Sequence, residues 1–253
     1  MTEVYLSRLL LDLTQPEVRR NLSDIYQLHR TILSAFPQAL AGTSARQHFG
    51  VLYRVESIAQ TPLQIRLLVQ STSAPDWSRL PATFFAPPLD ERGNPSIRRI
   101  DNDYTRITAG AQFFFRLRAN PTRRLSNRAS EREDRLAGKR VALLREEEQL
   151  VWLERKGAQH GFRLLKTHLH PEIPAVQVAR QGTDRGKRRT MDNRDIMPLT
   201  FGATLFTGFL EVTDANRFRT TLIEGIGSGK AFGFGLLSIA GSSNELSGPL
   251  PTS

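Results

Sequence analysis

The sequence has no cysteine, and this absence excludes several kinds of chemistry together. Disulfides, thiolate zinc sites, iron–sulfur clusters and cysteine nucleophiles all need that side chain. Long apolar runs are missing as well: no stretch approaches the roughly 18 apolar residues of a membrane-spanning helix, and no basic leader precedes the apolar run near the N-terminus. We therefore expect a soluble, cytoplasmic protein without a signal peptide or a membrane span.

Acidic residues are scarce relative to basic ones. Lys and Arg number 35 against 25 Asp and Glu, which gives a formal net charge of +10 over 253 residues. A surplus of this size indicates a polyanionic partner, either nucleic acid or an acidic membrane surface. The sequence offers no basic amphipathic helix with exposed bulky apolar side chains, so nucleic acid is favoured and no membrane partner is expected.

Hydrophobic spacing divides the chain into two successive units of similar element order. The first is expected to contain, in order, a strand over 4–11, a loop closed by Pro16, a helix over 22–36 capped by Ser23 or Asp24, and strands over 51–58, 63–72 and 97–107. The second is expected to contain strands over 111–119, 162–168, 176–179, 199–212 and 236–240, with helices over 141–156 and from Asp214 to Ile226.

This repeated β-α-β-β order predicts an α+β fold of tandem ferredoxin-like (βαββαβ-type) domains with a basic groove. We expect an N-terminal domain over 1–109, a C-terminal domain with a glycine-rich loop over 110–243, and a disordered tail over 244–253. The fold alone does not identify a function, because ferredoxin-like domains host many activities.

The positive charge is concentrated in two clusters. Residues 116–140 hold nine basic side chains against three acidic ones, and the basic ones are Arg116, Arg118, Arg123, Arg124, Arg128, Arg132, Arg135, Lys139 and Arg140. The second cluster lies in a segment expected to be an exposed hairpin or loop and consists of Arg180, Arg185, Lys187, Arg188, Arg189 and Arg194. Either cluster alone is also compatible with a merely solvated face. Arginine predominates, however, and its planar fork suits bidentate contacts with phosphate.

A glycine-rich loop, GIGSGKAFGFG, spans 225–235. It is not a Walker A loop, because Glu224 and Ala231 stand where that motif needs glycine and a hydroxyl residue. It is not a dinucleotide-binding fingerprint either, because Lys230 stands where that motif needs glycine and the loop follows a helix instead of opening one. Residues 230–237 match an RNA-recognition consensus only in part, with too little chain behind them to complete that module. The glycines still allow the backbone to approach a phosphate, with Lys230 adding charge, although a tight helix-to-strand connection needs the same residues.

The histidines are candidates for a metal site or an active site. His168 and His170 have no carboxylate at ligand spacing, so no metal site and no cofactor are predicted. His29 lies one helical turn from Tyr26, and the two side chains can converge. Helical spacing alone favours a buried, hydrogen-bonded core histidine over an active-site residue, because His29 lies near the middle of the apolar stripe.

Four motifs occur together and in order: Tyr26-Gln27-Leu28-His29-Arg30, Pro75-Asp76-Trp77-Ser78, the strand FRLRANP over 115–121, and Gly225-Ile226-Gly227-Ser228-Gly229-Lys230. In this combination the chain closely resembles the CasE-type endoribonucleases of type I-E CRISPR systems, members of the repeat-associated protein superfamily. The likeness spans about residues 4–240. The departures are the 180–194 segment and the polar tail.

The resemblance implies a metal-independent endoribonuclease without cofactors. Such an enzyme binds the hairpin of a CRISPR repeat transcript, cuts on its 3′ side by attack of the 2′-OH, and leaves a 2′,3′-cyclic phosphate and a 5′-OH. It keeps the guide RNA and joins the other Cascade subunits. By resemblance, the catalytic residues are Tyr26 and His29, and Arg30 and Lys230 lie near the RNA.

Together with the charge clusters and the glycine loop, the expected RNA-binding residues are Arg30, Arg116, Arg118, Arg123, Arg124, Arg128, Lys139, Arg140, Arg185, Lys187, Arg188, Arg189, Gly227, Gly229 and Lys230. Two alternatives remain at this point. One is a non-catalytic scaffold subunit that binds an RNA hairpin in a CRISPR ribonucleoprotein, and the other is a general nucleic-acid-binding protein.

Overall fold

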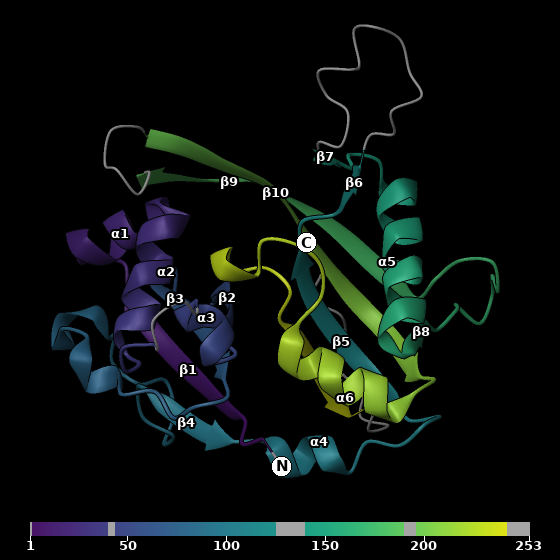
Figure 1. Ribbon diagram of the computed structural model, residues 1–253, viewed down its shortest axis with the longest axis horizontal. Coiled ribbons are helices and arrows are strands. Elements are labelled where there is room, and N and C mark those ends of the chain that lie inside the picture. Colours follow the sequence, from purple (N-terminus) through teal and green to yellow (C-terminus); the bar gives the residue numbers. More distant parts are fainter. Residues whose placement is uncertain (1, 40–43, 125–139, 190–195, 242–253) are drawn as a thin grey trace, which may run out of the picture.

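Two antiparallel sheets, one from each half of the sequence, form the framework of the computed structural model, which describes residues 2–39, 44–124, 140–189 and 196–241. The sheets lie side by side, and helices cover one face of each (Figure 1). No helix in these ranges is long and apolar enough to cross a membrane.

The first sheet has the strand order β2-β3-β1-β4, with neighbours antiparallel. Its strands are β1 (Tyr5–Asp12), β2 (Leu52–Ser57), β3 (Gln64–Ser71) and β4 (Ser96–Arg99). The helices of this half are α1 (Pro16–Ser23), α2 (Ile25–Ser34), α3 (Ala45–His48) and α4 (Asp101–Thr105), with single turns η1 (Trp77–Arg79) and η2 (Ala82–Phe84).

The second sheet repeats this order as β11-β5-β10-β8. Its strands are β5 (Gln112–Ala119), β8 (Phe162–Leu164), β10 (Ile196–Val212) and β11 (Leu237–Gly241). The helices α5 (Glu146–His160) and α6 (Ala215–Glu224) cross between strands, and the single turn η4 (Lys230–Phe232) lies in the glycine loop. In both sheets the first and third strands are central neighbours, which is the ferredoxin-like order, so the predicted tandem fold is confirmed.

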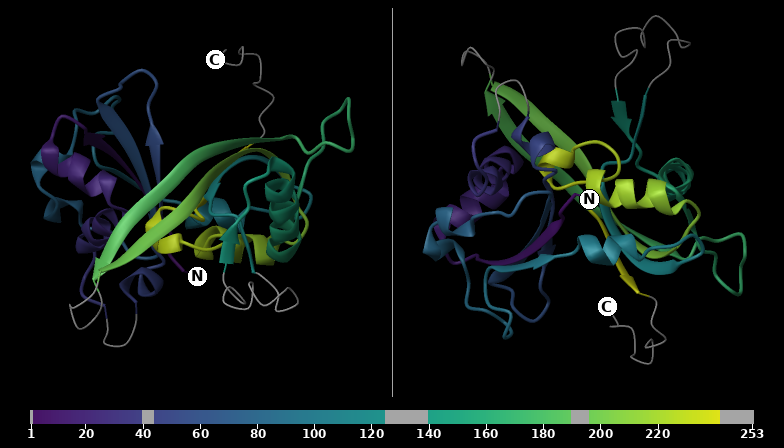
Figure 2. Two further views of the ribbon diagram at one scale, coloured as in Figure 1. Left: turned by 90° about the horizontal axis from the view of Figure 1, so that it is seen from above. Right: turned by 60° about the horizontal axis from the view of Figure 1, so that its bottom comes forward.

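Two hairpins extend from the second sheet. Strand β9 (Val176–Arg189) pairs with β10, and this long hairpin reaches across to the helices of the first half (Figure 2). A shorter pair, β6 (Thr122–Arg124) with β7 (Arg140–Ala142), lies beside the start of α5.

Each half has its own core. In the first, Leu28 and Ile32 of α2 pack on Leu9 and Val69 of the sheet. In the second, Trp152 and Leu153 of α5 and Phe218 and Leu222 of α6 pack on the sheet in the same way, and the sheet contributes Phe206 of β10 to this core. The expected domain boundary at 109/110 falls between α4 and β5, and we retain the division into two domains as a proposal.

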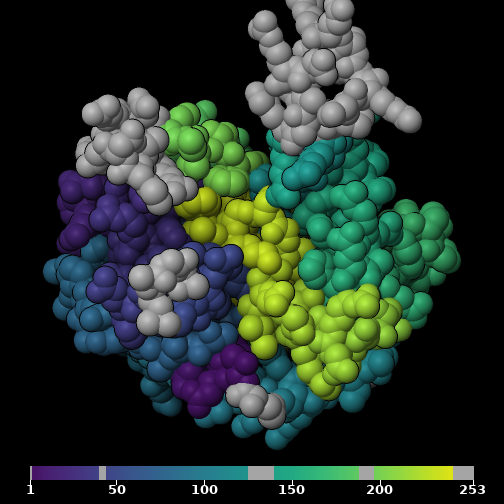
Figure 3. Space-filling view, in the orientation of Figure 1, coloured from purple at the N-terminus to yellow at the C-terminus, as the bar shows by residue number. Residues whose placement is uncertain are grey.

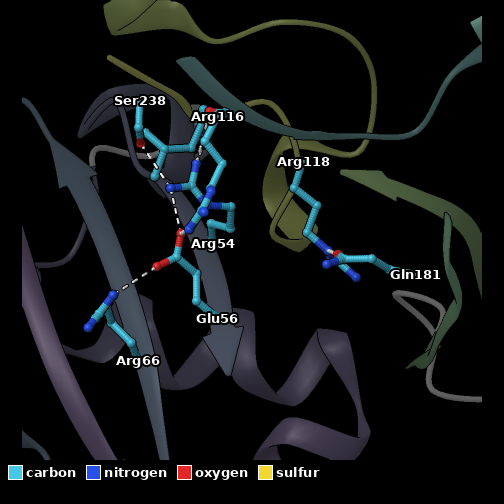
Figure 4. A network of polar contacts seen from close by, with 8 residues as sticks. Arg54, Glu56, Arg66, Arg116, Arg118, Gln181 and Ser238 are labelled. Carbon is cyan, nitrogen blue, oxygen red and sulfur yellow. Dashed lines mark hydrogen bonds and ion pairs between the residues drawn. The ribbon is translucent and has the colours of Figure 1, made fainter. Parts of the chain in front are cut away.

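A buried arginine joins the two sheets (Figure 4). Arg54 of β2 donates to Glu56 at 2.8 Å, to the carbonyls of Arg116 and Leu236 at 3.2 and 3.1 Å, and to Ser238 Oγ at 3.0 Å. Burial alone would raise the pKa of Glu56, but the charges and hydrogen bonds of the surrounding arginines outweigh it and the pKa lies below its usual value. The first sheet is therefore fixed to β5 and β11, the strands next to the glycine loop.

Several predicted elements are wrong at their ends. The segment before Asp24 is a separate helix with Pro16 at its first turn, because Asp24 is extended (φ −130°, ψ 107°) and interrupts the helix predicted over 22–36. The strand predicted over 97–107 ends at Arg99 and gives way to α4, and the helix predicted from 141 begins only at Glu146 because 140–142 pair in a hairpin.

Candidate RNA-cleavage site

The helix α2 carries Tyr26, His29 and Arg30. Its start is fixed by Asp24, whose carboxylate accepts hydrogen bonds from the N–H groups of Tyr26 and Gln27. Such a cap is worth about 0.5–2 kcal/mol. Leu28 and Ile32 face the core, which leaves Tyr26 and His29 half-buried at its edge and Arg30 exposed.

His29 faces the glycine loop of the other half. Its ring lies edge to face with Phe232, with centroids 5.8 Å apart, and its Nδ1 is buried with no hydrogen-bond partner among the described residues. Burial, aided by the charge of Arg46, lowers the pKa of His29 to about 4. The expected hydrogen-bonded core histidine is thus not what the structure shows: the imidazole is neutral at pH 7 and has an unused nitrogen.

The glycine loop is held against the first sheet. Tyr53 of β2 donates from its hydroxyl to the carbonyl of Ala231 at 3.2 Å. Gly233 has φ +83°, and a Cβ there would lie 3.1 Å from the Tyr53 ring, so a side chain at this position is strained and crowded. Within the described chain, the N–H groups of Gly227, Ser228 and Gly229 make no backbone hydrogen bond. Backbone donors of this kind suit an anion.

A cleft of about 530 Å³ lies on the other side of the glycine loop, between the loop, β6, β7 and α5. None of the described residues that line it is acidic, and seven carry basic or imidazole groups: Arg123, Arg124, Arg140, Arg155, Lys156, His160 and Lys230. In the space-filling view the loop lies at the surface between the first half and α5 (Figure 3). The cleft is a concentrated positive surface.

The cations of this cleft repel one another. Burial lowers the pKa of Lys156, and the charges of Arg155 and Arg140 lower it further. Burial likewise lowers the pKa of Lys230, and the charges of Arg46 and Lys156 act in the same direction, although Glu224 opposes them. The ammonium of Lys230 is therefore repelled by Arg46 on the side of His29 and by Lys156 in the cleft. An anion bound next to Lys230 would relieve this repulsion.

The predicted RNA-binding residues fall into several groups. Arg123, Arg124, Arg140, Gly227 and Lys230 line the cleft, whereas Tyr26 and His29 do not. Arg185 and Lys187 are exposed on β9. Arg116 and Arg118 share a face of β5 as predicted, but they have protein partners: Arg116 lies 3.5 Å from Glu56, and Arg118 donates to both oxygens of Asp184 at 2.8 and 2.9 Å.

Some predicted residues are not described. Arg128 and Lys139 lie outside the described residues, as do Arg132, Arg135, Arg194 and the tail over 244–253, and only the backbone of Arg188 and Arg189 is described.

Sequence reasoning missed Arg46 and three residues of α5, namely Arg155, Lys156 and His160. Arg46 lies in a four-residue helix with no motif around it. The α5 residues occupy the polar side of a helix, a pattern that a solvated face gives equally well. Only the fold shows that these α5 residues lie opposite the glycine loop. Among the described residues, no group of three or more His, Asp or Glu could hold a metal ion.

Comparison with known proteins gives consistent matches. The profile of the family described as CRISPR associated protein matches residues 4–241. The chain is 34% identical over 238 residues to the CRISPR-associated endoribonuclease Cse3 of Thermus thermophilus, covering 94% of this chain and 100% of that protein. It is 26% identical over 219 residues to the CRISPR system Cascade subunit CasE of Escherichia coli, covering 86% and 92%.

A solved structure is also similar. Cse3 bound to a 19-nucleotide RNA matches with a TM-score of 0.74 and 32% identity, covering 94% of this chain and 99% of that one.

Proposed function

The chain belongs to the family of CRISPR-associated proteins, and from that premise we propose that it is an endoribonuclease that processes CRISPR repeat transcripts. It would bind the repeat hairpin, cut on its 3′ side, retain the guide RNA and join other Cascade subunits. Its relatives carry the names endoribonuclease and Cascade subunit, and one is solved with RNA bound. Because the substrate is a transcript, we expect it to act in the cytoplasm.

The reaction we propose needs no metal. The 2′-oxygen of the upstream ribose attacks the scissile phosphorus, a P–O2′ bond forms, and the bond to the 5′-oxygen breaks. The products are a 2′,3′-cyclic phosphate and a 5′-OH. One proton leaves the 2′-OH and one reaches the departing 5′-oxygen, so the step consumes no water.

His29 suits the first proton transfer. Its lowered pKa keeps the imidazole unprotonated at neutral pH and therefore able to accept a proton. Tyr26, one turn earlier, orients the 2′-OH or shares in proton transfer. Arg46 and Lys230 provide positive charge for the negative charge that develops on the phosphate.

The observation that carries the proposal is the meeting of His29 with the glycine loop, on whose other side the basic cleft lies. The phosphates of an RNA strand could contact the cations of the β9–β10 hairpin and those of the cleft. Between these two groups of cations the strand would pass the imidazole of His29. We propose Arg30, Arg123, Arg124, Arg140, Arg185, Lys187, Gly227, Gly229 and Lys230 as RNA contacts.

The test is cleavage of a panel of end-labelled CRISPR repeat hairpins by the purified protein in EDTA, with end-group analysis. We expect one cut at the 3′ base of the hairpin and a cyclic phosphate end. The matched control is the same RNA with a 2′-deoxy nucleotide upstream of the cut, which should bind equally and stay intact. Tight hairpin binding without any cutting would instead support the scaffold alternative, and equal binding of random duplex DNA would support the general nucleic-acid binder.

A further inference from the structure

One side chain connects the helix of Tyr26 and His29 to the β9–β10 hairpin. Oδ1 of Asp24 accepts hydrogen bonds from the N–H groups of Tyr26 at 2.8 Å and Gln27 at 3.3 Å. Its other oxygen, Oδ2, accepts a hydrogen bond from the N–H of Lys187 in β9 at 3.3 Å. The carboxylate that caps α2 thus also holds a strand of the other half of the chain.

Strand β9 approaches α2 so closely here that only glycine fits. Gly186 is buried, and a Cβ at this position would lie 2.7 Å from Ile25 Cγ1, 3.0 Å from Asp24 Oδ1 and 3.2 Å from the Tyr26 nitrogen. Two of these three atoms belong to the cap and to the first turn of α2, which cannot move without moving the helix. The glycine therefore sets the distance between the hairpin and α2.

A second anchor lies on the same face of β9. Asp184, two residues before Gly186, accepts both hydrogen bonds from the Arg118 guanidinium, which also donates to Gln181 at 2.8 Å. That guanidinium lies 4.7 Å from the ring centroid of Phe234 in the glycine loop region. Since side chains alternate along a strand, Arg185 and Lys187 point to the opposite face, where both are exposed.

We propose that Asp24 and Gly186 are positioning residues: they dock the outward-facing cations of β9 onto α2, so that an RNA backbone held by Arg185 and Lys187 meets Tyr26 and His29 in one fixed geometry. The inference rests on the cleavage reaction proposed above. Arg118 contributes to the same positioning, because its hydrogen bonds to Asp184 anchor β9 to β5. In this role its guanidinium contacts protein groups.

Fixed geometry matters more for cleavage than for binding. Phosphate contacts are largely electrostatic and tolerate small displacements. In-line attack needs the reacting atoms about 3–3.5 Å apart, and a misplacement of about 1 Å can cost about 100-fold in rate. Loosening the docking should therefore preserve RNA affinity and lower the rate of the bound complex.

The direct test compares Gly186→Ala with Gly202→Ala. Gly202 lies in the partner strand β10, and a Cβ there would meet its nearest atoms at an ordinary 3.5 and 3.9 Å. We expect Gly186→Ala to cut about 10–100-fold more slowly than wild type in single-turnover reactions at saturating enzyme, with a Kd for the hairpin within about threefold. Gly202→Ala should match wild type in both. A Gly186→Ala variant that cuts at the wild-type rate would overturn the proposal.

A second pair covers the case in which Gly186→Ala does not fold. In Asp24→Asn the side-chain oxygen still caps α2, because asparagine caps as well as aspartate, but the amide nitrogen cannot accept from Lys187. Asp214→Asn makes the same change at the cap of α6, where Asp214 accepts from the N–H of Arg217 at 3.0 Å. We expect a slower saturated rate for Asp24→Asn alone, and equal rates for the two variants would contradict the role of Asp24.

Failure of the nuclease proposal can be distinguished from failure of the docking proposal. If wild type cuts no repeat RNA, that proposal fails, and the docking is then judged by amide hydrogen exchange with bound hairpin RNA. RNA should increase protection over residues 25–30 in wild type and Gly202→Ala but not in Gly186→Ala. Equal protection in all three proteins would overturn the docking proposal by itself.

Discussion

The imidazole of His29 and the ring of Phe232 meet edge to face with their centroids 5.8 Å apart, although one belongs to the first sheet's helix layer and the other to the glycine loop of the second half. Tyr53 reinforces this contact through its hydrogen bond to Ala231. The candidate site is therefore shared between the two halves. The cleavage proposed for this site would depend on the relative placement of the two halves as much as on the residues themselves.

Replacement of His29 by alanine should slow cleavage strongly and keep binding. An acid–base group contributes about 10²–10⁴-fold to the rate, so we expect a loss of that size in single-turnover cleavage with the hairpin Kd within about threefold. His168→Ala is the control, because that histidine is exposed and lies between β8 and β9, outside α2 and the glycine loop. Full activity of purified His29→Ala would refute its catalytic assignment.

The pH dependence of kcat/KM should reflect the lowered pKa of His29, because this parameter reports groups of the free enzyme. With a pKa of about 4, the imidazole stays neutral down to mildly acidic pH. We expect kcat/KM to be flat between about pH 6 and 8 and to fall only as the pH approaches that pKa. An acidic limb centred near 6.5, the ordinary pKa of histidine, would show that the RNA-free site does not hold the ring as described.

The same pKa predicts a change in stability. A histidine whose pKa is lower in the folded state than its unfolded value of 6.5 takes up its proton more readily when unfolded. Its stabilising effect is present above pH 6.5 and is lost as the pH falls toward 4, with a slope of at most about 1.4 kcal/mol per pH unit. Urea unfolding should show this slope in wild type and a smaller one in His29→Ala.

Arg155 and Lys156, which line the cleft from α5, should contribute affinity and not chemistry. Replacing Arg155 and Lys156 by glutamine should weaken hairpin binding and reduce the slope of log Kd against log salt by about 1 for each RNA phosphate that is no longer neutralised. The rate at saturating enzyme should change little. Arg92→Gln/Arg98→Gln removes the same charge from exposed positions near β4 and should leave the salt slope unchanged. Identical slopes for the two double variants would exclude the cleft from the RNA path.

The sequence predicted the framework because strand periodicity and turn residues are local. The errors arose where one residue interrupts a continuous pattern. Apolar spacing runs from Leu22 through Phe36 without a break and predicts one helix. Asp24, one of the two predicted caps, does cap α2 with its carboxylate, but its extended backbone also ends a separate preceding helix that the spacing does not predict. Pro16 stands at the first helical position of α1, where its missing N–H costs nothing.

The site was harder to predict because its parts come together only through long-range contacts. Periodicity placed His29 in the apolar stripe, and nothing local shows that a glycine loop some 200 residues later leaves its Nδ1 without a hydrogen bond. Charge counting treated Arg118 like the other arginines of its cluster. Its partner Asp184 lies 66 residues away in sequence and could not be assigned without the fold.

Glu56 provides the last prediction, because it balances a buried charge between the sheets. Its side chain is 10% exposed and that of Arg54 is 3% exposed. Removing one partner of a buried ion pair costs about 3–5 kcal/mol, and Glu56→Gln should fall near the lower end, since the amide oxygen still accepts from Arg54. Glu154→Gln, which breaks an ion pair with Lys166 that is 42% and 40% exposed, should cost less than about 1 kcal/mol.

Acid titration separates this effect from ordinary loss of packing. The pKa of Glu56 lies below its usual 4.5, so its stabilising effect is present above that pH and is lost as the pH falls through the lowered value. Urea unfolding of wild type should lose this part on acidification, whereas Glu56→Gln should not. Because Arg54 also holds β5 and β11 beside the glycine loop, cleavage by Glu56→Gln should decline with the folded fraction. His29→Ala should instead be folded and inactive, and a folded but inactive Glu56→Gln would contradict the purely connecting role of this pair.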